Sequence, residues 1–354
     1  MEENAVPQAH GIVLAGAYSG GLCALDQLAP RPLLPVAQQP LVTYALRWMA
    51  SGGLRSVTIC ANSEARSIRA RLKSSTFGLR LDYLEDWNPR GAAGCARDAG
   101  VKVKADVFVV ADATSVPVVD LADLLASHEA SEAAMTVVVG TNGAGRLRPS
   151  GVYVFDRRSF AYIPEDGFQD IKEKLIPRLY AASEPVSIFM ARGVAPRVVN
   201  ADTYLALNRW VIERTSHYRE APDGFRIFGE AVLHESATVD PTANLLGPVL
   251  LGAGVSVRAG ATLVGPVSIG SGTTVGEGAV VSRSVLWSEC VVGEGSFVDR
   301  SMLADRAVVE PRGAVISELR TSRNGGAPQQ AKRSPRAPWA PILGALRPAT
   351  PHQG

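Results

Sequence analysis

The chain has 354 residues, of which 46% are hydrophobic and 20% charged, as expected for a globular protein of two domains. Its net charge of +2 gives no argument for nucleic-acid binding, and no apolar run is long enough to predict a membrane span. The four cysteines are far apart, which argues against a disulfide framework and favours a cytoplasmic location. The polar N-terminus, residues 1–9, is predicted to be disordered and does not resemble a signal peptide.

Short apolar runs alternate with helical stretches between residues 10 and 222. Strands are predicted at 11–15, 56–61, 106–111, 135–140 and 151–155, and helices at 41–53, 65–75 and 120–131. The strands are almost continuously apolar, which is typical of a parallel sheet that is covered on both faces. The alternation therefore predicts an α/β, doubly wound, Rossmann-like domain.

A different pattern extends over residues 228–318. Aliphatic residues recur there at every sixth position, at Val239, Leu245, Leu251, Val257, Leu263, Ile269, Val275 and Val281. The phase slips near Trp287 and then resumes. A period of six fits neither a free strand nor an α-helix, but it fits the short strands of a three-sided, left-handed parallel β-helix. A glycine-rich aliphatic loop is the plainer alternative, and eight successive residues in phase disfavour it.

The last segment, residues 319–354, is rich in proline and arginine and is predicted to be disordered. It holds six basic and no acidic residues, so the rest of the chain has a formal net charge of −4. Its residues Trp339, Ile342, Leu343 and Leu346 have helical spacing. This spacing is compatible with a short docking segment for a partner, or with a tail that has no such role.

Several motifs of the first domain resemble the sugar-phosphate nucleotidyltransferases, or NDP-sugar pyrophosphorylases, such as mannose-1-phosphate guanylyltransferase and glucose-1-phosphate adenylyltransferase. From Gly16 onward, "GAYSGGLCALDQLAPRPLLPV" is similar to the family signature GGxGTRLxPLTxxxPKPLLPV without a gap. Further family segments resemble "EDWNPRGAAGCA" (85–96), "SGVYVF" (150–155) and "ADTYLALNRW" (201–210). The resemblance covers about residues 10–318, including the six-residue repeats.

The family reaction implied by this resemblance joins an NTP to a sugar 1-phosphate, whose oxygen attacks the α-phosphorus while pyrophosphate leaves. The implied nucleotide contacts are Leu14, Ala15, Gly16, Gly20, Gly21, Arg31, Gly91, Ala93 and Gly94. Gly151 is implied to contact the sugar, and Arg31 and Asp112 are implied to be catalytic. Asp112 is also the implied metal ligand, for Mg²⁺, if the site is active. Asp112 could instead be a turn residue after a core strand, and Arg31 a solvated surface charge.

The charged positions of the family signature are the ones that this chain changes. The signature arginine falls on Gly21, and the signature lysine becomes Arg31. The second metal-binding aspartate of the family falls near Arg197, while Asp202 is close in sequence but out of register. A long family stretch that carries a sugar-phosphate lysine is reduced here to residues 140–150.

Two functions remain open on this basis. The chain could be a degenerate member that binds a nucleotide or nucleotide sugar, and that assembles through its β-helix with itself or with an active relative. It could instead be an active pyrophosphorylase with rearranged phosphate contacts, for which the candidates are Arg146, Arg148, Arg192 and Arg197. A hexapeptide acyltransferase ranks lowest, because His234 is the only histidine of the repeat region.

Overall fold

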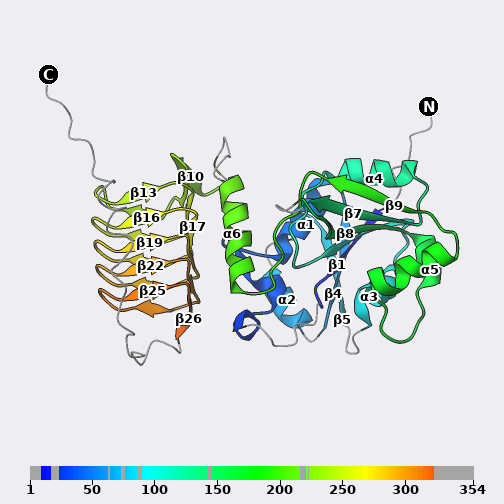
Figure 1. Cartoon of the computed structure of the whole chain (residues 1–354), viewed down its shortest axis with the longest axis horizontal. Coiled ribbons are helices and arrows are strands. Elements are labelled where there is room, and N and C mark those ends of the chain that lie inside the picture. The colour runs from blue at the N-terminus through cyan, green and yellow to red at the C-terminus, as the bar shows by residue number, and fades with distance from the viewer. Residues whose placement is uncertain are drawn as a thin grey trace, which may run out of the picture.

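The structure is a computed structural model that describes residues 9–16, 24–62, 64–72, 76–85, 90–141, 145–215, 221 and 223–322. The predicted disorder of residues 1–9 and 319–354 falls largely outside these residues, as do Gly20, Gly21 and the segment from Trp339 to Leu346. Two domains lie side by side, with helix α6 (Ala201–Thr215) between them (Figure 1). None of the helices in the described ranges has the length and apolar character that a membrane span requires.

The first domain is built on a seven-stranded sheet with the strand order β5-β4-β1-β6-β8-β7-β9. Its strands are β1 (Ala9–Leu14), β4 (Ser56–Ala61), β5 (Arg80–Glu85), β6 (Val107–Asp112), β7 (Met135–Thr141), β8 (Leu147–Asp156) and β9 (Val186–Ala191). Each strand predicted for this domain is present. The two additional strands, β5 and β9, form the edges of the sheet, and their alternating exposed residues interrupt the apolar runs that reveal the central strands.

One strand differs from the expected parallel arrangement. β8 pairs antiparallel with both β6 and β7, whereas the other strand pairs of this sheet are parallel. β7 ends at Thr141 and β8 begins at Leu147, so the connection is long enough for a hairpin but too short for a parallel crossover. The sheet is therefore mixed, and the parallel arrangement expected from the apolar runs does not hold at this strand.

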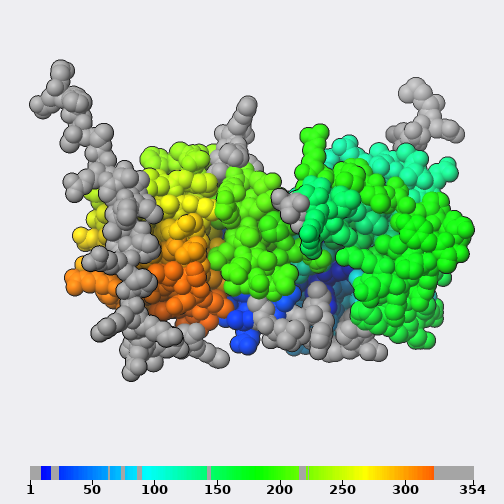
Figure 2. All heavy atoms as spheres, viewed as in Figure 1, coloured from blue at the N-terminus to red at the C-terminus, as the bar shows by residue number. Residues whose placement is uncertain are grey.

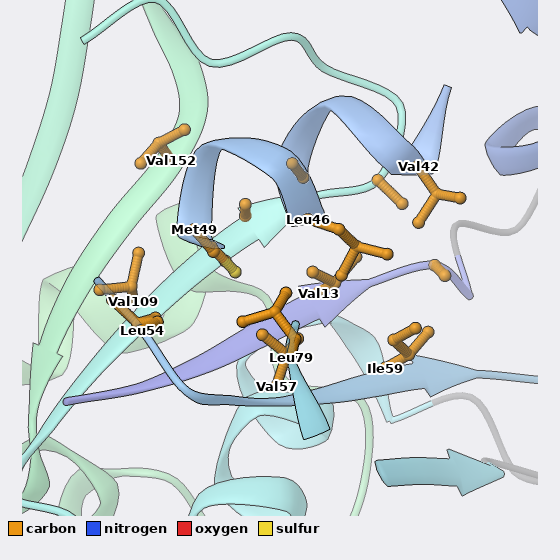
Figure 3. Packing of buried hydrophobic residues seen from close by; sticks show 14 of the residues in the cluster. Val13, Val42, Leu46, Met49, Leu54, Val57, Ile59, Leu79, Val109 and Val152 are labelled. Carbon is orange, nitrogen blue, oxygen red and sulfur yellow. The ribbon is translucent and has the colours of Figure 1, made fainter. Parts of the chain in front are cut away.

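Helices cover both faces of this sheet. They are α1 (Val42–Ser51), α2 (Ala65–Leu72), α3 (Gly91–Gly100), α4 (Leu121–Ala130) and α5 (Ile176–Ala181). Successive residues of β1 point to opposite faces, as a strand requires. Val13 packs with Leu46 and Met49 of α1 (Figure 3), whereas Ile12 packs in a second cluster with Ala93 of α3. Burial on both faces explains why the central strands read as continuous apolar runs.

The second domain is the predicted β-helix, made of three stacks of short strands (Figure 1). One stack contains β10 (Phe225–Phe228), β11 (Ala231–His234), β14 (Val249–Leu251), β17 (Val267–Ile269), β20 (Val285–Leu286), β23 (Met302–Leu303) and β26 (Leu319–Arg320). The second contains β12 (Thr238–Val239), β15 (Ser256–Val257), β18 (Thr274–Val275), β21 (Val291–Val292) and β24 (Val308–Val309). The third contains β13 (Asn244–Leu246), β16 (Thr262–Val264), β19 (Val280–Ser282), β22 (Phe297–Asp299) and β25 (Ala314–Ile316). Apart from the antiparallel β10–β11 pair, neighbouring strands are parallel, and the left hand of the coil stays a prediction.

The phase slip seen in the sequence is a shortening of the coil. Leu251 pairs with Ile269, 18 residues further on, whereas Ile269 pairs with Leu286, 17 residues further on. The corner before β17 contains Gly265-Pro266, and the corner before β20 contains Arg283 in a left-handed conformation with φ 46°; β20 has two residues where β17 has three. The inward-facing aliphatic residues keep their stacking because the missing residue lies at the start of the strand, so that Ile269 still pairs with Leu286.

Helix α6 fills the junction between the two domains, as the space-filling view shows (Figure 2). Tyr204 is fully buried, and its hydroxyl donates to the carbonyl of Pro35 in β2 (Pro35–Val36). The indole nitrogen of Trp287, in the β-helix, donates to the same hydroxyl at 2.9 Å. Asn208 accepts from the N–H of Ala37 at 2.9 Å. The "ADTYLALNRW" segment therefore fixes the two domains to each other.

Candidate functional site

The carboxyl ends of β1 and β6 meet near the middle of the first sheet. Leu14, the last residue of β1, pairs with Asp112, the last residue of β6, and the N–H of Ala113 donates to the Leu14 carbonyl at 3.0 Å. β1 lies between β4 and β6, so the chain changes direction across the sheet here. Ligands of open α/β sheets bind at such a switch point. The predicted contacts Leu14, Ala15 and Gly16 therefore lie next to Asp112.

Both carboxylate oxygens of Asp112 are engaged by neighbouring donors. Oδ1 accepts from the backbone N–H of Thr114 at 2.8 Å and from its hydroxyl at 2.7 Å. Oδ2 accepts from Nη2 of Arg197, with which Asp112 forms an ion pair. The side chain of Asp112 is 17% exposed and that of Arg197 is 45% exposed. The guanidinium therefore stands at the surface of this edge, where a ligand can reach it.

Arg197 comes from the segment between β9 and α6, 85 residues after Asp112. The next residue, Val198, is buried in the apolar cluster between the domains. Asn200 caps α6, because its side-chain oxygen accepts from the N–H of Thr203 at 2.9 Å. These two anchors on one side of Arg197 hold its backbone beside the end of β6.

Gly151, on β8, packs closely against the side chain of Asp112. Its φ is +88°, and a Cβ at this position would lie 3.1 Å from the Cβ of Asp112, so only glycine fits without strain. Tyr153 follows on the same strand and is buried. Burial, and next the Asp112 carboxylate, raise the pKa of Tyr153 to about 12, while Arg197 opposes this shift. The sequence motifs did not single out this neutral phenol, whose pKa is affected by both charges of the ion pair.

The start of α3 lies at the same edge, because α3 follows the carboxyl end of β5. Gly91 has φ +75°, and a Cβ there would meet the carbonyl oxygen of Gln169 at 2.5 Å. The N–H groups of Ala93 and Gly94 donate to this carbonyl at 3.0 and 3.4 Å. Close approach of the chain to itself thus accounts for the glycine at position 91. Nucleotide contacts of Gly91, Ala93 and Gly94 stay predictions.

Arg31 is engaged by a carboxylate from its own neighbourhood. Its Nε and Nη2 donate to the two carboxylate oxygens of Asp26 at 2.7 and 3.0 Å. Asp26 lies in the short helix η1 (Ala24–Gln27), and Arg31 begins the next one, η2 (Arg31–Leu33). A ligand phosphate would compete with this bidentate pair, so the predicted role of Arg31 at the phosphates stays a prediction.

The other candidate arginines surround the short β7–β8 hairpin on the same edge of the sheet. Arg148 of β8 pairs with Gly140 of β7, and Gly140 pairs in turn with Ala191, the last residue of β9. Arg192 follows directly, and Arg146 precedes β8. All three arginines are exposed. They place positive charge at the carboxyl ends of β7 and β9.

The model of the family described as "Nucleotidyl transferase" matches residues 10–188, which is half of the chain. The chain belongs to this family. Mannose-1-phosphate guanylyltransferase of Mycobacterium tuberculosis is 25% identical over 284 residues, which cover 71% of this chain and 77% of that protein. A putative mannose-1-phosphate guanyltransferase of Sulfolobus acidocaldarius is 24% identical over 267 residues, with 68% and 70% covered.

A solved structure of HddC from Yersinia pseudotuberculosis, complexed with GMP-PN, has 15% sequence identity to this chain and a TM-score of 0.44. The match covers 52% of this chain and 90% of the HddC chain. Nucleotide and sugar-phosphate substrates fit the family as a whole. The resemblance seen in the sequence motifs is thereby confirmed at the level of the family.

Nucleotidyltransferases of this family generally use a divalent metal, so the residues at Asp112 can be tested for the ability to hold one. Within the described ranges no group of three His, Cys, Asp or Glu side chains could hold a metal ion. Asp112 offers one carboxylate, whose oxygens already accept from Thr114 and Arg197. The guanidinium places a fixed positive charge in direct contact with the only predicted ligand. The side chains that the structure describes around Asp112 therefore do not fit a divalent cation there.

Proposed function

We propose that this protein binds a nucleotide or a nucleotide sugar at the β1–β6 edge and catalyses nucleotidyl transfer poorly or not at all. The observation that carries the proposal is the ion pair between Arg197 and Asp112. An active site of this family would need the Asp112 carboxylate for its metal, and Mg²⁺ is the ion expected in that case. Losing one preorganised charge contact at a reacting phosphate typically lowers the rate about 10²- to 10³-fold.

A pyrophosphate-release assay tests this proposal. The intact protein is incubated with Mg²⁺ and with pairs of NTPs and sugar 1-phosphates, and Asp112→Asn serves as the matched control. We expect no release above the level of the control. Robust turnover that depends on Asp112 would contradict the proposal and favour the alternative, an active pyrophosphorylase that draws on Arg146, Arg148 or Arg192 at the same edge.

The β-helix supports a regulatory or assembly role within this proposal. Its first stack packs against α6 through Val232, Leu250 and Met302, whereas the other two stacks face away from the first domain (Figure 1). These outer faces could pair with a second copy of the chain or with an active relative. Light scattering after gel filtration would detect self-association. A monomer at all concentrations would contradict pairing with a second copy, and only pairing with an active relative would stay open.

An acyltransferase function has no support from the surroundings of His234. The ring of His234 packs edge-on against the ring of Phe225, with 5.1 Å between the ring centroids. Its Nδ1 lies 2.8 Å from the hydroxyl oxygen of Ser236. Both contacts stabilise the first coil. We expect no binding of acetyl-CoA by calorimetry, and saturable binding would contradict this view.

A further inference from the structure

We infer that the guanidinium of Arg197 is the resident cation of this site, so that a diphosphate group binds beside Asp112 without a divalent metal. The inference rests on the proposed function, because it needs a phosphate-bearing ligand at the β1–β6 edge. It goes further by assigning the contact that a metal would otherwise make to a named side chain of this chain.

Arg197 has more N–H donors than its contact with Asp112 uses. A guanidinium carries five N–H donors in one plane, in a fork that matches two phosphate oxygens. Nη2 donates to Asp112, and within the described part of the chain no other hydrogen bond of this guanidinium is made. Because the side chain is 45% exposed, the remaining donors can be reached from solvent.

Asp112 holds this cation in a defined position. The Thr114 backbone and hydroxyl fix one carboxylate oxygen at 2.8 and 2.7 Å, so the other oxygen points in a defined direction. Arg197 meets that second oxygen, and buried Val198 anchors its backbone. Asp112 thus acts as a positioning residue for Arg197, in the way that it would orient a bound metal.

The charge of Arg197 also disfavours a metal at this site. An arginine side chain carries a fixed positive charge in proteins. A divalent ion that approached Asp112 would meet this fixed charge at close range and would have to displace it. The ion pair is neutral as a whole, whereas a carboxylate with a divalent ion carries a net positive charge. Diphosphate binding at this site should therefore be weaker than at a metal-loaded site, and Mg²⁺ should not strengthen it.

The first experiment measures Mn²⁺ binding to the full-length protein by electron paramagnetic resonance. We expect the wild type to leave Mn²⁺ free and Arg197→Asp to bind it, because this substitution removes the cation and adds a carboxylate. Arg192→Asp is the matched control, since it makes the same charge change on the same segment, and it should leave Mn²⁺ free. Adding Asp112→Asn to Arg197→Asp should abolish the gained binding. Asp112-dependent Mn²⁺ binding by the wild type, or equal gains in both single variants, would overturn the inference.

The second experiment uses inorganic pyrophosphate as the probe, in calorimetric titrations with EDTA and with Mg²⁺. We expect binding in EDTA that Mg²⁺ does not tighten, and a loss of about 10-fold or more in Arg197→Gln, as for a charge-assisted hydrogen bond. Binding that requires Mg²⁺, or no binding under either condition, would overturn the inference. The pyrophosphate-release assay tests the proposed function separately, because it measures turnover and not whether Mn²⁺ or pyrophosphate binds at Asp112.

Discussion

The interior of the β-helix and the carboxyl edge of the first sheet differ in how far apart their determinants lie in the sequence. In the β-helix, each inward-facing aliphatic residue meets its neighbour one coil away, as Leu263 meets Val281. At the sheet edge, Asp112 contacts Arg197, which follows it in the sequence only after three further strands. Repeated apolar packing is thus specified locally, whereas the charge of the site depends on which distant segments the fold brings together.

The largest effect on stability is expected within the β-helix interior. Leu263 is fully buried, and Leu263→Ala should lower the free energy of unfolding by about 2–5 kcal/mol, through lost burial and the cavity that remains. Urea unfolding followed by circular dichroism measures the change. Val308→Ala, on the outer face at 38% exposure, is the matched control and should cost much less. Equal losses would mean that the interior does not stabilise this domain.

A buried carboxylate on strand β22 of the β-helix, Asp299, provides a contrast with the exposed pair at the sheet edge. Burial alone would raise the pKa of Asp299, but hydrogen bonds from Ser282, Arg283 and Arg300 outweigh it and hold the pKa below its usual value of 3.8. The ionised form is therefore favoured in the folded state. Its contribution to stability is present above the ordinary pKa and is lost as the pH falls through the lowered one.

The variant Asp299→Asn tests that contribution. At pH 7 it should lose about 1.5–3 kcal/mol, the range for hydrogen bonds to a charged group, and its melting temperature should fall. The difference in melting temperature from the wild type should shrink as the pH falls below about 4. Glu310→Gln, at an exposed corner, is the control and should show no such trend. A difference that grows toward low pH would contradict the account.

The junction between the two regions is expected to show the next largest effect. Tyr204→Phe removes the hydroxyl that accepts from Trp287 and leaves this buried indole N–H without its partner, so it should cost about 1–3 kcal/mol. Tyr180→Phe, at 60% exposure, is the matched control. Thermal unfolding by calorimetry would compare the two. Equal stability of the variants would show that the hydroxyl does not hold the domains together.

The smallest effect on stability is expected at the site itself. Arg197→Gln should change the free energy of unfolding by only about 0–1 kcal/mol, because the ion pair is partly exposed to water. Melting temperatures of the variant and the wild type measure this. A loss of several kcal/mol would mean that Arg197 is needed for folding and not for the ligand, which would reverse the contrast between the two regions.

Much of the fold could be predicted from the sequence because its signals are local. The period of six identified the β-helix, and continuous apolar runs identified β1, β4, β6, β7 and β8. The edge strands β5 and β9 could not be recognised in this way, because one face of each is partly exposed. The antiparallel direction of β8 could be predicted only from the short connection between β7 and β8, and not from the apolar pattern.

The site could be predicted only in part. The motifs led to Leu14, Asp112 and Gly151, which the fold brings to one edge of the sheet. The family pattern placed the missing aspartate near Arg197, but it could not reveal that the guanidinium of Arg197 contacts Asp112. That contact depends on the path of the chain between β9 and α6, which no local pattern encodes.

The most direct test of the account is a crystal structure of the full-length protein grown with Mn²⁺ and a nucleoside diphosphate, with anomalous scattering used to locate the metal. The account predicts that the guanidinium of Arg197 lies between Asp112 and the phosphates, with no anomalous peak at Asp112. A Mn²⁺ peak within coordination distance of Asp112, with Arg197 displaced, would contradict it.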